Sequence, residues 1–227
     1  MEPPKTLRPL DAASLVLYRR RNRGPEVLMG QRHAGHVFMP HRFVFPGGRV
    51  DPRDARVAAA SALPPAAEAK LALGCRSPAR VHALAIAAVR ETYEETGLMI
   101  GVPSPFAGRL DERHWQGFRE AGIAPALDRL RYIFRAVTPP GMVRRYDARF
   151  FLAEADGTLH GALGGDGELE NMAWLAIEEA LALDLSLPTR LVLEEVPRLI
   201  GTDPSADAGR PVPFLFTRRG RDILKAE

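Results

Sequence analysis

Arg90-Glu91-Thr92-Tyr93-Glu94-Glu95-Thr96-Gly97-Leu98 is the stretch around which this chain is organised. On an α-helix of 3.6 residues per turn, Glu91, Glu94 and Glu95 lie at roughly 0°, −60° and +40°, so three carboxylates share one face. Carboxylates this close repel one another, and within the stretch only Arg90 offers a positive charge. Such a face favours a hard cation coordinated by oxygen, with Mg²⁺ as the first choice and Mn²⁺ as a substitute.

A glycine turn precedes this acidic segment in the chain. Phe43-Val44-Phe45 reads as a short strand, and Pro46-Gly47-Gly48 ends it where the backbone passes close to another group. The acidic helix itself is expected to begin at Pro78, with Ser77 as its N-cap, and to stop at Gly97. Its buried stripe is predicted to contain Val81, Leu84, Ala88 and Thr92.

The glycine turn and the acidic helix together resemble the Nudix box, G-x5-E-x7-R-E-U-x-E-E-x-G-U, in which U is a bulky apolar residue. Three departures are visible. Asp54 stands where the box has its first Glu, and Thr92 stands at the first U. In addition, 35 residues separate Asp54 from Arg90 where the box has seven, so 28 residues are inserted. An interrupted box of this kind is similar to that of the coenzyme A diphosphatases of the Nudix family.

The resemblance implies an α/β fold, a Nudix-type α/β/α sandwich with a mixed β-sheet. It implies a single domain over residues 1–227 with a helical insert at about residues 55–83. Within the insert, residues 66–73 are expected to form a short helix that Gly74 ends. Because the insert is rich in alanine and carries few charges, we expect it to pack on the domain or on a second subunit, which leaves a homodimer open.

The resemblance also implies which residues hold the metal and act in catalysis. The main-chain carbonyl of Gly48 and the carboxylates of Glu91, Glu94 and Glu95 are the expected metal ligands, and Glu91 and Glu94 are also candidate catalytic residues. Arg90 is expected to orient a carboxylate by an ion pair. Asp54 would replace the box glutamate, although its side chain is one methylene shorter.

Two further groups of candidates come from segments outside the acidic helix. A glycine-rich loop at residues 161–167 precedes Glu168 and Glu170, either of which is a candidate for the general base, as is Glu91. The nearest basic side chains that are able to bind phosphates are Arg32, Arg42 and Arg49.

The resemblance implies an Mg²⁺-dependent diphosphatase. The resemblance points to coenzyme A or acyl-coenzyme A as the substrate, and ADP-ribose and dinucleotides remain open. The alternative from another class is a Nudix module that binds a nucleotide without cleaving it. Recognition of nucleic acid is disfavoured because no aromatic side chains are interleaved with the arginines.

Composition sets the remaining limits. The chain has 227 residues, of which 46% are apolar and 26% charged, as in a globular protein. Its net charge of +3 suits a polyphosphate without requiring nucleic acid. Cys75 is the only cysteine, and no stretch has the length of a membrane span, so a cytoplasmic protein is expected.

Apolar periodicity predicts the remaining elements. The predicted strands are 12–18, 26–29, 130–136, 146–153 and 168–175, and the predicted helices are 109–121, 177–183 and 188–200.

Overall fold

The structure is a computed structural model that describes residues 7–35, 39–106 and 112–227. In these residues a mixed nine-stranded sheet forms the centre of the molecule, and its main path runs in the order β10-β2-β1-β8-β7-β11-β12. The short strands β3 and β4 pair with β2 and β1. Strand β1 is parallel to β8 and β7 is parallel to β11, whereas the other pairs are antiparallel. The strands are β1 Leu10–Arg21, β2 Gly24–Arg32, β3 Phe43–Val44, β4 Gly47–Arg49, β7 Arg131–Val137, β8 Tyr146–Glu154, β10 Leu169–Ala176, β11 Pro213–Arg218 and β12 Arg221–Ala226.

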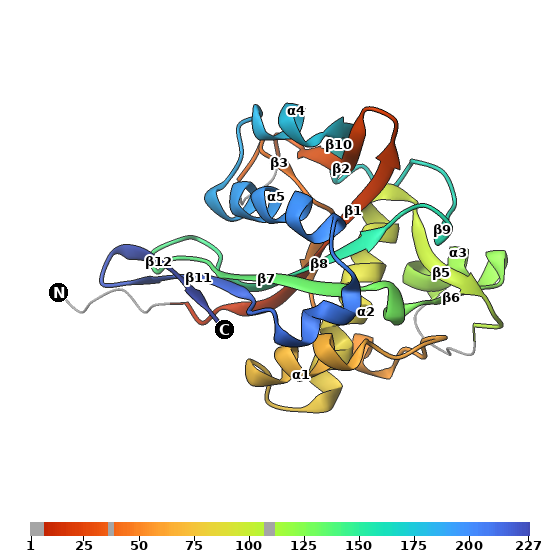
Figure 1. Cartoon of the computed structure of the whole chain (residues 1–227). Coiled ribbons are helices and arrows are strands. Elements are labelled where there is room, and N and C mark those ends of the chain that lie inside the picture. The colour runs from red at the N-terminus through yellow and green to blue at the C-terminus, as the bar shows by residue number, and fades with distance from the viewer. Residues whose placement is uncertain (1–6, 36–38, 107–111) are drawn as a thin grey trace.

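Helices cover both faces of this sheet (Figure 1). Successive residues of β1 alternate between the two cores, so Leu15 and Leu17 pack with α2 while Val16 and Tyr18 pack with α4 and α5. A small sheet of β5, β6 and β9 lies at one end beside α3. The α/β/α sandwich with a mixed sheet is therefore confirmed. The remaining elements are α1 Pro65–Leu73, α2 Pro78–Thr96, α3 Glu112–Ala121, α4 Ile177–Leu181, α5 Leu187–Ile200, β5 Met99–Pro103, β6 Ile123–Pro125 and β9 Leu159–His160.

The acidic helix has the boundaries that its sequence predicts. Helix α2 begins at Pro78 and ends before Gly97, whose φ of 74° is the left-handed conformation that glycine adopts readily. Ser77 precedes the helix, but its side chain makes no capping hydrogen bond. The predicted stripe of Val81, Leu84, Ala88 and Thr92 is buried. Burial of this stripe against the sheet fixes the rotation of α2 and so the direction of its carboxylates.

The insert folds against the body of the protein at several points. Asp51 caps a short 3₁₀ turn at Pro52–Arg56, and α1 follows and ends at Gly74 as predicted. Lys70 of α1 donates to the carbonyl of Asp207, which lies in a second 3₁₀ turn at Pro204–Gly209.

The other predictions differ from the structure in their bounds and in what they omit. Each predicted strand and helix has a counterpart, although residues 109–111 of one predicted helix lie outside the described residues. Helix α5 continues through Pro197 to Ile200. The strands β5, β6, β9, β11 and β12 and the 3₁₀ turns, including a third at Leu127–Arg129, were not predicted, and Gly47–Arg49 forms strand β4 where a turn was predicted.

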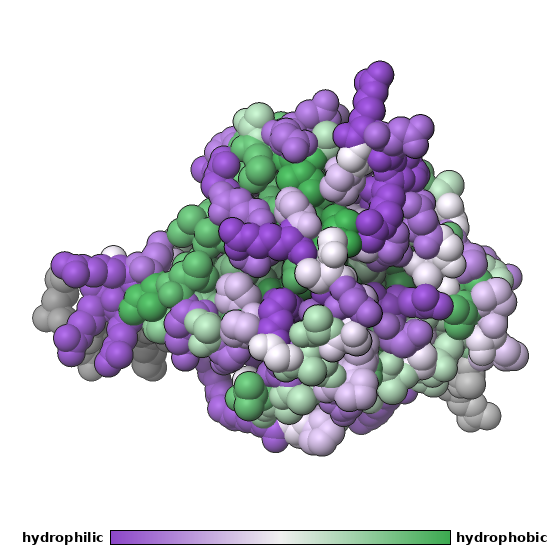
Figure 2. Space-filling view, in the orientation of Figure 1, coloured by the Kyte–Doolittle hydropathy of each residue, from purple (hydrophilic) through white to green (hydrophobic). Residues whose placement is uncertain are grey.

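The hairpin β11–β12 extends from the body beside the turn between β7 and β8 (Figure 1). Figure 2 shows hydrophobic residues gathered where this extension leaves the body and hydrophilic ones toward its end. None of the described helices is long and apolar enough to cross a membrane.

Candidate active site

The guanidinium of Arg90 is the centre of the charged cluster at the end of α2. It donates from Nε and Nη2 to the two carboxylate oxygens of Asp54, at 2.9 and 3.0 Å. Nη1 donates to Glu91 at 2.8 Å and to Glu94 at 3.0 Å, and Nη2 also donates to the carbonyl of Arg49 at 2.8 Å. Arg90 thus joins the 3₁₀ turn before the insert, strand β4 and the acidic helix.

Glu94 is held by protein groups on both of its oxygens. Oε2 accepts from Arg90, and Oε1 contacts Nδ1 of His114, which lies on α3. His114 was not predicted as a site residue, because it lies 20 residues beyond Glu94 and belongs to no local motif.

Glu91 and Glu95 face Gly47 and Gly48, which begin β4 and belong to the segment predicted as a glycine turn. The backbone N–H of Gly47 donates to Glu95 Oε2 at 2.7 Å. A Cβ atom at Gly48 would lie 2.5 Å from Glu91 Oε2, so only glycine fits there without moving the carboxylate. The structure therefore brings together the turn and the acidic helix, which are separated by the insert in the sequence.

Burial strongly disfavours the charged forms of these two carboxyls. It raises the pKa of Glu91 to about 7, against the opposing charge of Arg90. It also raises the pKa of Glu95 well above its usual value, although the Gly47 hydrogen bond favours the carboxylate. A cation between them would stabilise both ionised forms.

Glu168 is the third carboxylate of this region. It precedes β10 and lines the same cavity as Glu91 and Gly48, and its charge contributes to the raised pKa of both Glu91 and Glu95. Both Glu168 and Glu170 are exposed, but Glu170 does not line this cavity, and its Oε1 lies 3.7 Å from Nε2 of His33.

The donors around the glycine turn fit a hard cation, because they are carboxylate oxygens in negative excess beside a backbone that approaches closely. Among the residues that the structure describes, no three His, Cys, Asp or Glu side chains form a ready-made metal cluster.

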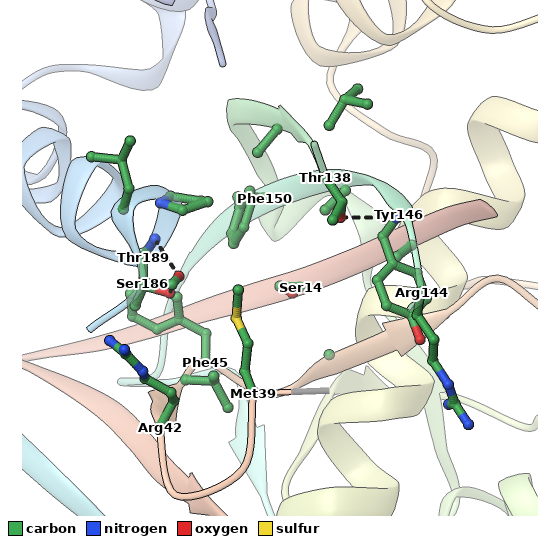
Figure 3. A pocket seen from close by; sticks show the side chains of 18 of the residues that line it. Ser14, Met39, Arg42, Phe45, Thr138, Arg144, Tyr146, Phe150, Ser186 and Thr189 are labelled. Carbon is green, nitrogen blue, oxygen red and sulfur yellow. Dashed lines mark hydrogen bonds between the residues drawn. The ribbon is translucent and has the colours of Figure 1, made fainter. Parts of the chain in front are cut away.

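A cavity of about 980 Å³ opens from Glu91, Gly48 and Glu168 across the sheet toward α5 and β11. Figure 3 shows Arg42 at one end and Arg144 beside Tyr146 at the other, with Ser14, Phe45 and Phe150 between them. The cavity combines a charged end, where the carboxylates lie, with an apolar interior. It has room for a diphosphate and for a larger group attached to it.

The three predicted phosphate-binding arginines all line this cavity, in different settings. The charge of Arg32 lowers the pKa of Glu95, which places it near the carboxylates. Arg42 donates to Asp184 at 2.5 Å and to the carbonyl of Leu185 at 3.0 Å, so its guanidinium is held at the rim. Arg49 is exposed and follows Gly48 directly.

A solved structure of a Nudix hydrolase from Alicyclobacillus acidocaldarius is 30% identical to this chain, with a TM-score of 0.64, and the match covers 83% of this chain and 91% of the other. The chain belongs to the Nudix hydrolase family. It is accordingly a hydrolase that acts on diphosphate linkages, and the departures from the Nudix box have to be explained within that family.

Two other solved structures match at lower identity. An Ap4A hydrolase from C. elegans is 17% identical with a TM-score of 0.47, over 84% of this chain and 97% of that one. The Nudix domain of NrtR from Shewanella oneidensis, solved with ADP ribose, is 13% identical with a TM-score of 0.48, over 88% and 94%. No protein family profile and no curated protein matches the sequence.

Asp54 and Thr92, the two residues that differ from the Nudix box in the predicted match, both have local partners. Asp54 is 1% exposed and binds Arg90 through both oxygens. Thr92 is fully buried, and its hydroxyl donates to the carbonyl of Ala88 at 2.7 Å, so no polar atom is left without a partner. Neither substitution disrupts the arrangement of the acidic helix.

Proposed function

We propose that this Nudix hydrolase cleaves the diphosphate linkage of a nucleoside diphosphate derivative in a reaction that depends on Mg²⁺, with Mn²⁺ as a substitute. The observation that carries the proposal is the close approach of Glu91 and Glu95 to Gly47 and Gly48, beside a cavity that Glu91, Gly48 and Glu168 line. These carboxylates and the nearby arginines would receive a diphosphate at the charged end of the cavity.

In this proposal Glu91, Glu95 and the Gly48 carbonyl hold the cation, and Glu94 belongs to the same ligand set. When bound, the cation neutralises charge on the diphosphate and lowers the pKa of a water molecule. Because both oxygens of Glu94 already have protein partners, its first task is to hold Arg90 in place, and ligation would require the contact with His114 to open.

The chain's own residues supply the remaining functions. Arg90 holds the carboxylates of Glu91 and Glu94 in position by hydrogen bonds. Arg32, Arg42 and Arg49 line the cavity and bind the phosphates of the substrate. The water oxygen forms a bond to one phosphorus, the anhydride bond breaks, and the second phosphate leaves. Glu168 accepts the proton of the attacking water, or Glu91 does so if it does not ligate.

Coenzyme A or acyl-coenzyme A is the first substrate to test, because the interrupted box resembles that of coenzyme A diphosphatases. The size of the cavity supports a substrate with a bulky group on the diphosphate. ADP-ribose and dinucleotides are the alternatives within the same reaction. We propose that the protein acts in the cytoplasm.

The test is phosphate-ester release from coenzyme A, acetyl-coenzyme A, ADP-ribose and diadenosine tetraphosphate, with Mg²⁺, Mn²⁺ or EDTA. We expect one substrate class to be cleaved, EDTA to abolish cleavage, and Glu91→Gln to lower kcat by at least about a hundredfold. Glu170→Gln, a change of an exposed carboxylate of β10 that does not line the cavity, is the control and should stay within about twofold of wild type. Tight nucleotide binding without any release would favour the non-catalytic alternative.

A further inference from the structure

The floor of the cavity contains a row of alanines on three neighbouring strands. Ala12 of β1 pairs with Ala148 of β8, and Ala148 pairs with Ala136 of β7. All three line the cavity. Directly paired residues point to the same face of a sheet, so their methyl groups form one flat surface, here called the alanine floor.

Two aromatic side chains bound the alanine floor along β8. Phe150 and Tyr146 lie two residues to either side of Ala148, so all three point to the same face, and the two aromatic residues are about 13 Å apart along the strand. Phe150 makes an edge contact with Phe134, its partner on the neighbouring strand β7, with ring centroids 6.0 Å apart. Figure 3 shows the rings of Phe150 and Tyr146 separated along the cavity, with Ser14 and Thr138 near them.

The alanine floor is continuous with the charged end of the site. Arg49 pairs with Ala12, and Gly48 pairs with the next residue of β1. With strands about 4.8 Å apart, the floor extends from about 5 Å to about 15 Å from the Arg49 backbone. A group attached to a diphosphate at Gly48 and Glu91 would therefore extend over Ala12 first and Ala148 and Ala136 next.

The shape and chemistry of this region select for a flat group. Methyl groups and aromatic rings provide apolar area to cover a planar ring, as in many ligand pockets. Hydroxyls of Ser14, Thr138, Ser186, Thr189 and Thr217 also line the cavity, and each oxygen can accept a further hydrogen bond from a ring edge, although the last four already have protein partners. A nucleobase combines a flat apolar face with a polar edge, whereas an alkyl chain cannot form hydrogen bonds with the hydroxyls.

We propose that the alanine floor is the nucleoside subsite, with the base lying over Ala148 and Ala136 between Phe150 and Tyr146. The small side chain of Ala148 sets the space available to the base and makes this position specificity-determining. The inference rests on the proposed function, since it takes the diphosphate to lie at Gly48 and Glu91.

The test compares two non-hydrolysable probes that differ only in whether a nucleoside is present. Binding of α,β-methylene-ADP and of methylenediphosphonate is measured by calorimetry with Mg²⁺ for wild type, Ala148→Leu and Ala12→Val. We expect the Kd of α,β-methylene-ADP to rise at least about tenfold in Ala148→Leu, because the added side chain occupies the base position, and to rise less in Ala12→Val. The Kd of methylenediphosphonate should change by less than about twofold, since it stays at the charged end.

Ala72→Leu is the matched control, because Ala72 is exposed on α1 away from the cavity. Thermal unfolding of each variant checks that the fold is retained, and Ala12→Val provides the same test if Ala148→Leu does not fold. Unchanged affinity for α,β-methylene-ADP in a folded floor variant would overturn the inference. So would a loss confined to acyl-coenzyme A, which would assign the floor to an acyl chain.

Failure of the proposed function has a different signature. In that case wild type releases no phosphate ester from any substrate, whatever the floor variants bind. If wild type cleaves a nucleotide and Ala148→Leu leaves its KM unchanged, only the assignment of the floor is wrong.

Discussion

Replacement of Arg90 by methionine tests whether one buried guanidinium holds the site together. Methionine retains much of the side-chain length but cannot donate hydrogen bonds. The variant removes both hydrogen bonds to Asp54 and those to Glu91, Glu94 and the Arg49 carbonyl. Asp54, only 1% exposed, then keeps a single donor, the backbone N–H of Asp51 at 2.8 Å.

The expected loss of unfolding free energy follows from the burial of the ion pair between Arg90 and Asp54. Removal of one partner of a buried ion pair costs about 3–5 kcal/mol, because the other charge is left uncompensated. For a chain of 227 residues, about 2–4 °C of Tm is lost per kcal/mol, which corresponds to a decrease of about 6–20 °C. Neutralising the stranded carboxylate in Arg90→Met/Asp54→Asn should recover about 1–3 kcal/mol of the loss.

The assay is urea unfolding followed by circular dichroism for wild type, both single variants and the double variant, without metal. The coupling energy between residues 54 and 90 in this double-mutant cycle decides whether the two side chains interact. If the two single losses add to the double loss within about 0.5 kcal/mol, Asp54 and Arg90 do not interact as described, and the explanation of the interrupted box is wrong.

Two further predictions concern the glycine turn and acid stability. In Gly48→Ala the new Cβ would lie 2.5 Å from Glu91 Oε2 and displace the carboxylate, so steady-state kinetics should show kcat lower by at least about tenfold, while Gly209→Ala, which has no neighbour within 4 Å of the new atom, should match wild type. Burial opposes ionisation of Asp207, but hydrogen bonds from Arg131 hold its pKa below its usual value, so its stabilisation is present above about pH 4 and is lost as the pH falls further. Urea unfolding should show Asp207→Asn less stable than wild type at pH 7, with the difference shrinking toward pH 3; a constant difference would contradict this assignment.

Local patterns were sufficient to predict the acidic helix. Its proline start, its glycine stop and its buried stripe are all set within about 20 residues of sequence, and the structure has the same limits. The meeting of Gly48 with Glu91 was predicted only through the family resemblance. Composition and periodicity carry no information on which distant segments fold together.

The residues that the prediction missed come from contacts between distant segments. His114 reaches Glu94 because α3 packs beside α2, and the cavity wall includes Leu215 because β11 adds to β7. Pairing of this kind depends on the whole sheet, so no short window of sequence contains it. The partner of Arg42 could not be predicted for the same reason, because nothing in the sequence around Arg42 indicates that Asp184 binds its guanidinium.

The resemblance to the Nudix box implies 28 additional residues between Asp54 and Arg90, yet the side chains of these two residues meet. Lengthening a flexible loop from seven to 35 residues costs only about 1.4 kcal/mol of additional closure entropy, because the cost grows with the logarithm of length. The insert buries Leu63 and Leu71 at 8% and 1% exposure, and each such burial is worth about 1.5–3 kcal/mol. Its own packing thus offsets the added length. The ion pair between Asp54 and Arg90 then fixes the position of the segment before the predicted insert relative to α2. Asp54 therefore contacts Arg90 although 35 residues separate them in the sequence.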